Sequence, residues 1–138
     1  MRKLLRVLLR ALLGFLILGA VTWGIEVLHV VHFMRETQRN YTALGLRVGM
    51  NVREIPWPES KGVTISCGSG ESYFQIQNKD EWHDISIGRR TLPLACRKMH
   101  VLICGAFMEM ADYDIEFDEQ WNISNNGPLR FIRGPGLS

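Results

Sequence analysis

The chain has 138 residues, which is enough for one compact domain and an attachment segment but short for two ordinary domains. Apolar residues make up 46% of it and charged residues 22%, and this composition excludes wholesale disorder and a coiled-coil rod. Residues 1–39 carry six Lys or Arg against two Glu, a net charge of +4, whereas residues 40–138 carry ten against twelve, a net charge of −2. Because the body of the chain is not basic, we expect no nucleic-acid partner.

An apolar segment near the N-terminus is long enough to form a transmembrane helix. Residues 11–25 carry no charge, but these fifteen residues rise only about 22 Å as a helix. A start at Leu4 lengthens the segment to 22 residues and about 33 Å, which matches a hydrocarbon layer about 30 Å thick. The long side chains of Arg6 and Arg10 can carry their charges to the headgroups. In this register Glu26 lies at the opposite interface, and the sequence predicts a membrane anchor.

Two other interpretations of this segment stay open. A cleaved secretory signal has the same basic start and apolar core, although this segment is long for a signal and no clean cleavage site of small residues follows it. A core helix of a soluble domain would have a polar stripe facing water, whereas apolar residues here surround all faces. We therefore prefer a signal-anchor helix that stays in the bilayer.

The charges that flank the segment predict its orientation. Four Lys or Arg precede it, whereas Arg35 and Arg39 after it are partly offset by Glu36. The positive-inside rule then puts the N-terminus in the cytoplasm and the rest of the chain on the periplasmic or other extracytoplasmic side of the cell (inner) membrane. The predicted organisation is a cytoplasmic basic stub and transmembrane signal-anchor helix (1–35), a juxtamembrane helix end and Pro-containing linker (36–62), a small β-rich extracytoplasmic domain (63–133) and a tail (134–138).

After the anchor, the sequence predicts the end of the helix and then an extended linker. Gly45 and Gly49 should end the helix a turn or two beyond the anchor. Pro56 and Pro58, on either side of Trp57, exclude a helix there and favour an extended chain.

The segment that follows the linker carries mostly strand-like patterns. Apolar and polar residues alternate over residues 63–67, and apolar and acidic residues alternate strictly over residues 112–118. The nearly continuous apolar run over residues 99–107 predicts a central strand that is buried on both sides.

Two further elements complete the predicted sheet. Residues 78–81 predict a hairpin connection into a strand that contains Trp82, Ile85 and Ile87, and the last strand is predicted at residues 129–132. The predicted fold class is therefore a single N-terminal transmembrane helix followed by a small, mainly antiparallel β domain, either mainly β or α+β.

Three cysteines, Cys67, Cys96 and Cys104, fall on the predicted exported side, where disulfides form. The eight residues between Cys96 and Cys104 separate them by about 12 Å in a helix or about 26 Å in a strand, against the roughly 4.4–6.8 Å between Cα atoms that a disulfide needs. We expect a disulfide that joins Cys67 to Cys96 or to Cys104.

Two spacings leave a metal site open as an alternative. Cys96, His100 and Cys104 are four residues apart, so a helix would put them on one face, where Cys67 could complete a zinc site.

The second spacing lies at the end of the apolar segment. Glu26, His29 and His32 recur every three residues on one helix face, and such a pattern can ligate a metal ion or haem. One helix supplies too few ligands for a closed site, so this reading needs a partner or a dimer.

Four carboxylates form a ladder on the predicted acidic strand. Asp112, Asp114, Glu116 and Asp118 should lie on one strand face about 6.6 Å apart. A solvated strand face explains them most simply, and a surface for a basic partner, calcium binding or two-carboxylate glycoside chemistry are the alternatives. Arg130 on the following strand can neutralise part of this charge.

The sequence contains no G-x-S-x-G, H-E-x-x-H or C-x-x-C motif. We therefore predict a non-enzymatic accessory or scaffolding subunit without a cofactor, whose exported domain docks on another envelope component. Its expected partners are the lipid bilayer and a protein partner or further copies of itself in the membrane. The alternatives are a membrane-anchored metal or haem carrier and, more remotely, a hydrolase that uses the acidic strand.

Overall fold

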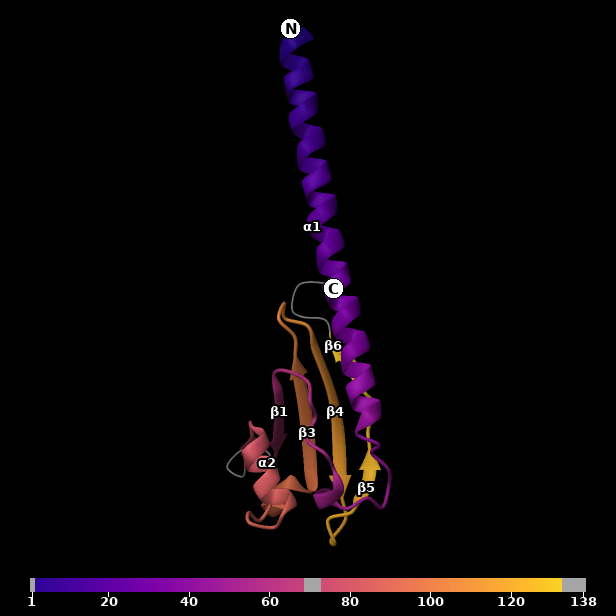
Figure 1. The fold of residues 1–138 in the computed structure, drawn as a ribbon, viewed down its shortest axis with the longest axis vertical. Coiled ribbons are helices and arrows are strands. Elements are labelled where there is room, and N and C mark those ends of the chain that lie inside the picture. The colour runs from indigo at the N-terminus through magenta and orange to yellow at the C-terminus, as the bar shows by residue number, and fades with distance from the viewer. Residues whose placement is uncertain (1, 69–72, 133–138) are drawn as a thin grey trace. The chain divides into compact units, whose positions relative to one another are not determined.

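The structure is a computed structural model that describes residues 2–68 and 73–132, with backbone alone for residues 2–5 (Figure 1). The predicted tail, 134–138, lies outside the described residues. In chain order the elements are α1 (Arg2–Ala43), η1 (Val52–Glu54), β1 (Val63–Cys67), β2 (Phe74–Ile76), α2 (Lys79–Ser86), η3 (Leu94–Arg97), β3 (Lys98–Cys104), β4 (Met110–Phe117), β5 (Ile123–Asn126) and β6 (Arg130–Ile132). The chain divides into two compact units between His32 and Phe33, a boundary that α1 crosses.

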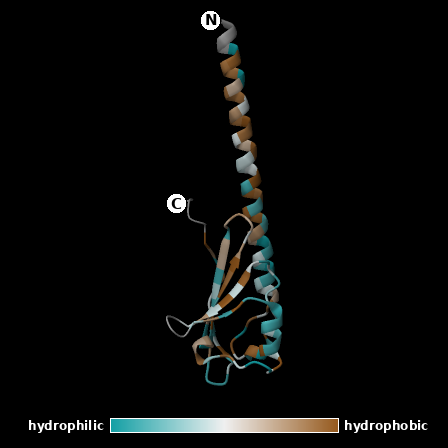
Figure 2. Ribbon diagram, turned by 90° about the vertical axis from the view of Figure 1, so that its left-hand side faces the viewer, coloured by the Kyte–Doolittle hydropathy of each residue, from teal (hydrophilic) through white to brown (hydrophobic). Residues whose placement is uncertain are grey.

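The first unit consists of the apolar part of α1. By length and composition this helix is long and apolar enough to cross a membrane. Its large apolar side chains are exposed, as in Phe15 at 75% and Leu28 at 70% of their full area. Figure 2 shows brown, apolar residues along this part and teal, polar residues gathering in the last turns of α1. Burial of apolar surface away from water gains about 25 cal/mol per Å². The exposed apolar side chains of this part of α1 therefore favour an apolar environment.

The second unit is an antiparallel sheet in the order β2-β1-β3-β4-β5, with β6 paired to β4 as well. The register aligns Ile76, Ile65, Val101 and Tyr113 in one row across four strands. All four side chains are at most 2% exposed. Because directly opposed residues point to the same side of a sheet, this row marks the core face.

The last turns of α1 cover this core face. Phe33 and Tyr41 pack against the buried cluster, and Thr37 and Leu44 are themselves buried. Their spacing of four, four and three residues puts them on one side of the helix. The Tyr41 hydroxyl donates to the Gly127 carbonyl at 2.9 Å, and its ring meets that of Tyr113 edge to face at 4.8 Å.

The structure corrects the prediction for residues 78–87, which form the helix α2 instead of a hairpin and a strand. The Asn78 side chain accepts a hydrogen bond from the Glu81 amide at 2.8 Å and so caps the first turn. Trp82 and Ile85, three residues apart, are buried, whereas Ile87 is 47% exposed. This burial has helical rather than strand periodicity, and the N-cap decides between the two.

The strand β3 is central, as predicted, but it is not buried on both sides. Met99, Val101 and Ile103 are buried, whereas His100 and Leu102 between them are half-buried on the opposite face. The strand also ends at Cys104, and the rest of the predicted run belongs to the turn before β4. Elsewhere α1 ends at Ala43 just before the predicted glycines, and β4 has the predicted alternation. The described chain thus has the predicted α+β form, a long N-terminal apolar helix and a small antiparallel sheet.

A disulfide joins Cys67 at the end of β1 to Cys96 in η3. Its Cα atoms are 4.6 Å apart, and both residues are at most 2% exposed. The sequence left two pairings of Cys67 open, and the structure has the one with Cys96. Cys104 is a free, exposed cysteine. The bridge closes a loop between residues 29 apart in the sequence, which restricts the unfolded chain.

We predict that Cys96→Ser lowers the free energy of unfolding by about 3–4 kcal/mol, the loop-closure contribution expected for a bridge of this span. Urea denaturation of the full-length protein in detergent, followed by near-ultraviolet circular dichroism, measures the loss. Cys104→Ser is the matched control and should leave the stability unchanged. Equal effects of the two substitutions would contradict the observed pairing.

Candidate functional site

The sheet face opposite the core carries charged and polar side chains. Strand register pairs Lys98 with Glu116, His100 with Asp114, and Asp112 with Arg130. Ser66 of β1 lies opposite His100, and Asn125 of β5 lies opposite Glu116. These eight residues are called the polar face: Ser66, Lys98, His100, Asp112, Asp114, Glu116, Asn125 and Arg130.

An arginine bound to two aspartates forms the centre of the polar face. Arg130 donates from Nε to Asp112 Oδ1 at 3.0 Å and from Nη2 to Asp112 Oδ2 at 2.9 Å. Its Nη2 also donates to Asp114 Oδ2 at 2.8 Å. The Asp112 side chain is only 7% exposed, whereas that of Arg130 is 52% exposed. The guanidinium therefore compensates a nearly buried carboxylate while one side of it stays in solvent.

The imidazole of His100 lies between the same two carboxylates. Its Nδ1 is 2.8 Å from Asp114 Oδ1, and its Nε2 is 3.8 Å from Asp112 Oδ2. The Ser66 hydroxyl donates to the main-chain carbonyl of His100 at 3.4 Å. Four strands, β1, β3, β4 and β6, thus contribute to one connected network.

The network shifts the pKa of two of its members. Partial burial of Asp114 acts to raise the pKa of its carboxyl, but the His100 hydrogen bond and the Arg130 charge outweigh it and lower the pKa. The Asp112 hydrogen bond and the carboxylate charges raise the pKa of Arg130. Both groups therefore stay charged at neutral pH.

Ser66, His100 and Asp114 stand side by side in the register, which is the residue set of a hydrolytic triad. Their hydrogen bonds differ from those of a triad. The Ser66 hydroxyl is directed to a backbone carbonyl, and the second imidazole nitrogen of His100 faces Asp112. A nucleophile must bond to its base, so this geometry suits an electrostatic network better than nucleophilic catalysis.

The prediction of four exposed carboxylates on one strand face is wrong for two of them. Asp112 is nearly buried, and Asp118 lies past the end of β4. Asp118 Oδ1 accepts from the amides of Gln120 and Asn122, both at 2.9 Å, and so caps the β4–β5 turn. The hydrogen bond from the Asn122 amide has the largest effect on the pKa of the Asp118 carboxyl, and that pKa is lowered.

The other two carboxylates are on the polar face, and each has a cationic or imidazole partner. Glu116 lies 3.1 Å from Lys98, and Asp114 is bound as described above. The structure bears out that Arg130 neutralises part of the strand. Whether Asp114 and Glu116 contact another protein stays a prediction.

The structure does not bring together the possible zinc ligands that the sequence analysis named. Cys96 lies in a disulfide, and Cys96, His100 and Cys104 belong to η3 and β3 rather than to one helix. Glu26, His29 and His32 do lie on the helix α1, at the spacing that the sequence gave. Within residues 2–68 and 73–132, no three His, Cys, Asp or Glu side chains are arranged to hold a metal ion.

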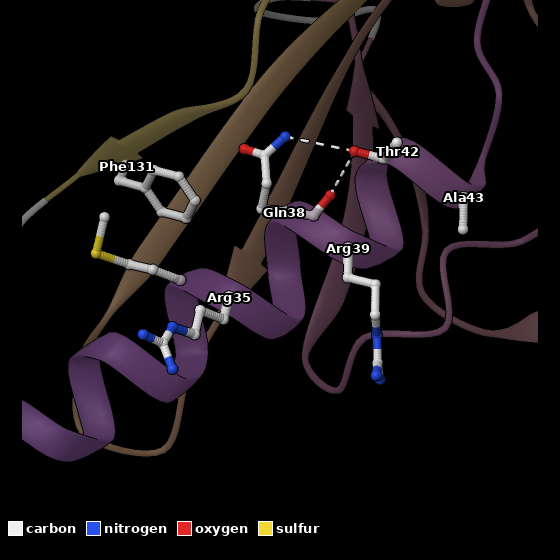
Figure 3. A pocket seen from close by; sticks show the side chains of 7 residues that line it. Arg35, Gln38, Arg39, Thr42, Ala43 and Phe131 are labelled. Atoms are coloured by element: carbon white, nitrogen blue, oxygen red, sulfur yellow. Dashed lines mark hydrogen bonds between the residues drawn. The ribbon is translucent and has the colours of Figure 1, made fainter.

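A shallow groove lies between the last turns of α1 and β6 (Figure 3). Phe131 of β6 faces the helix, and Gln38 and Thr42 are joined by hydrogen bonds along it. Its lining is mostly apolar, with two arginines at the rim, and comprises Met34, Arg35, Gln38, Arg39, Thr42, Ala43 and Phe131.

The sequence analysis missed Ser66, Lys98 and Asn125 as members of the polar face. The alternation over residues 63–67 does place Ser66 on the polar side of its strand. Which strands are neighbours depends on the sheet order, which local patterns do not contain.

Comparisons with protein-family models, curated proteins and solved structures found no match to this chain.

We predict that Arg130→Met lowers the free energy of unfolding by about 2 kcal/mol, because it leaves the Asp112 carboxylate nearly buried without its main partner. Lys98→Met is the matched control, and it should cost less than about 1 kcal/mol since its ion pair is exposed. Both are measured by urea denaturation of the full-length protein.

The double variant Asp112→Asn, Arg130→Met tests the reason for this loss. Removal of the buried charge should restore most of the stability that Arg130→Met takes away. A double variant no more stable than Arg130→Met would show that the cost is one of side-chain packing rather than of charge.

Proposed function

We propose that the protein is a single-pass membrane protein and a non-enzymatic accessory or scaffolding subunit. Its exported domain docks on another protein of the cell envelope through the polar face. One observation carries the proposal: the chain buries one face of the sheet under its own helices, while the other face presents paired charges of both signs that, apart from Asp112, are half-exposed or exposed.

The anchor in this proposal is α1. The segment is apolar on all sides, its described side chains are exposed, and its length fits a bilayer. The basic residues before it favour a cytoplasmic N-terminus, which puts the sheet on the extracytoplasmic side of the cell membrane. The Cys67–Cys96 disulfide supports this side independently, since disulfides persist in oxidising compartments.

The docking surface in this proposal is the polar face. Its charged side chains are held by one another, so binding costs less conformational entropy than with mobile side chains. Charges of alternating sign select a partner by complementarity and contribute more to specificity than to affinity. Because the polar face carries positive and negative side chains in pairs, it suits a partner protein with charges of both signs better than a uniformly basic partner.

Site-specific photo-crosslinking tests the docking. The full-length protein, with p-benzoylphenylalanine at the position of Asn125 on the exposed edge of the polar face, is irradiated in its native membrane. We expect one discrete adduct with another membrane or envelope protein. The photo-reactive residue at Lys79, exposed at the start of α2, is the control and should give no adduct of the same size.

A charge change ties the adduct to the polar face. Lys98→Glu reverses a charge in the same register row as Asn125, so the adduct should weaken severalfold. Equal adducts from both positions, or no adduct from Asn125, would refute the proposed docking. An adduct of twice the protein's own mass would identify a second copy of the chain as the partner and overturn the docking on another protein.

A further inference from the structure

A cleft lies at the end of the sheet where the β4–β5 turn meets η1 and the segment after α2 (Figure 1). The Val52 amide donates to the Trp121 carbonyl at 2.9 Å and so joins η1 to the turn. The cleft has a volume of about 320 Å³, which is at the lower end of the range for small-molecule sites. All of its lining residues belong to the second unit, and none of them is part of the polar face.

Among the described residues, two arginines and no carboxylate line this cleft. Arg90 is already paired, because its guanidinium lies 4.9 Å from the centre of the Phe74 ring and its Nη1 is 3.9 Å from Glu81 Oε2. The Arg53 guanidinium lies beside Gly88, where an added Cβ would come within 3.5 Å of its Nη2. Within residues 2–68 and 73–132, Arg53 forms no ion pair. The cleft therefore contains a positive charge that the described chain does not compensate.

The polar groups that remain available at the cleft are mainly hydrogen-bond donors. The Asn51 side chain is used within the chain, since its Oδ1 accepts from the Arg53 amide at 3.2 Å and its Nδ2 donates to the Gln120 carbonyl at 3.3 Å. The side chains of Thr91, Gln120 and Trp121 form no hydrogen bond with any other residue in the described part of the chain. A guanidinium and an indole N–H only donate, and a hydroxyl and an amide can donate, so this set suits an anion.

Trp121 is held in a strained conformation at the wall of the cleft. Its φ is 64°, in the left-handed region that a bulky side chain rarely adopts and that is frequent at functional sites. Its amide donates to the Asp118 carbonyl at 3.2 Å, and its ring lies 6.1 Å from that of Phe117. These contacts fix the indole beside the buried side chains of Val52 and Leu92, which also line the cleft. The cleft thus has an apolar wall next to its positive charge.

We propose that this cleft binds a small organic acid that carries one carboxylate and one apolar group. Arg53 pairs with the carboxylate, because a guanidinium can donate two parallel hydrogen bonds to its oxygens. The apolar group packs on Trp121, Val52 and Leu92. A carboxylate fits better than a phosphate monoester, which brings about two negative charges to a single uncompensated arginine. This site is independent of the proposed membrane span and of docking through the polar face.

Fluorine NMR of the full-length protein in detergent micelles tests the binding. All tryptophans are replaced by 5-fluorotryptophan, and the signal of Trp121 is assigned with Trp121→Phe. The probe is N-acetyl-L-leucine, and N-acetyl-L-leucinamide, which lacks the carboxylate, is the control compound. We expect the acid to shift the Trp121 signal with a midpoint on the order of 1 mM, as for a ligand with so few atoms. The amide should give no saturable shift, and the signal of Trp23, in the apolar segment, should not move with either compound.

Substitutions at two exposed arginines assign the binding to the cleft. Arg53→Gln should raise the midpoint at least about tenfold, the effect of losing a hydrogen-bonded charge. Arg89→Gln is the matched control, since Arg89 follows α2 but does not line the cleft, and it should leave the midpoint unchanged. Arg53→Lys keeps the charge without the two parallel donors and should weaken binding less than Arg53→Gln.

Three results would overturn the proposal. The first is the absence of a saturable shift of Trp121 with the acid, and the second is equal binding of the acid and the amide. The third is an equal loss of binding in Arg53→Gln and Arg89→Gln. The comparison of the two compounds uses the unaltered chain, so it decides the question even where a variant folds poorly.

Discussion

The packing of the last turns of α1 on the sheet is the interaction on which the rest of the structure depends. Phe33, Tyr41 and Leu44 cover the row of buried side chains at the centre of the sheet, and Tyr41 is also bonded to the carbonyl of Gly127. The sheet therefore uses, as its own second layer, the continuation of a helix whose earlier residues are apolar on every side. A small sheet buries too little surface to be stable by itself, so the helix and the Cys67–Cys96 bridge serve the same need.

Because one face is covered in this way, the polar residues collect on the other. Asp112 is nearly buried there, and Arg130 donates a hydrogen bond to each of its carboxylate oxygens. The same arginine reaches Asp114, which in turn holds His100. The polar face is thus held by contacts within the chain, as the proposed docking requires and as a row of solvated carboxylates would not be.

Local patterns predicted the elements better than their arrangement. The alternation in β4 and the helix end before Gly45 each depend on a few neighbouring residues, so the sequence was sufficient for them. Simple distances excluded a Cys96–Cys104 bridge, but they did not choose between Cys96 and Cys104 as the partner of Cys67. The helix α2 was missed because the capping residue Asn78 was interpreted as part of a turn. The sequence predicted that Arg130 neutralises part of the acidic strand, as the structure has it. It did not predict that His100, Lys98 and Ser66 join the same face, because their places depend on the pairing of β1 with β3 and of β3 with β4.

Labelling of the free, exposed Cys104 tests most directly whether the folded sheet lies outside the membrane that α1 is proposed to span. A membrane-impermeant maleimide is added to right-side-out and to inside-out vesicles that contain the native protein. The proposed topology predicts one labelled thiol in right-side-out vesicles, with Cys67 and Cys96 labelled there only after reduction and unfolding. Labelling of Cys104 in inside-out vesicles alone would place the sheet in the cytoplasm and contradict the export of the domain.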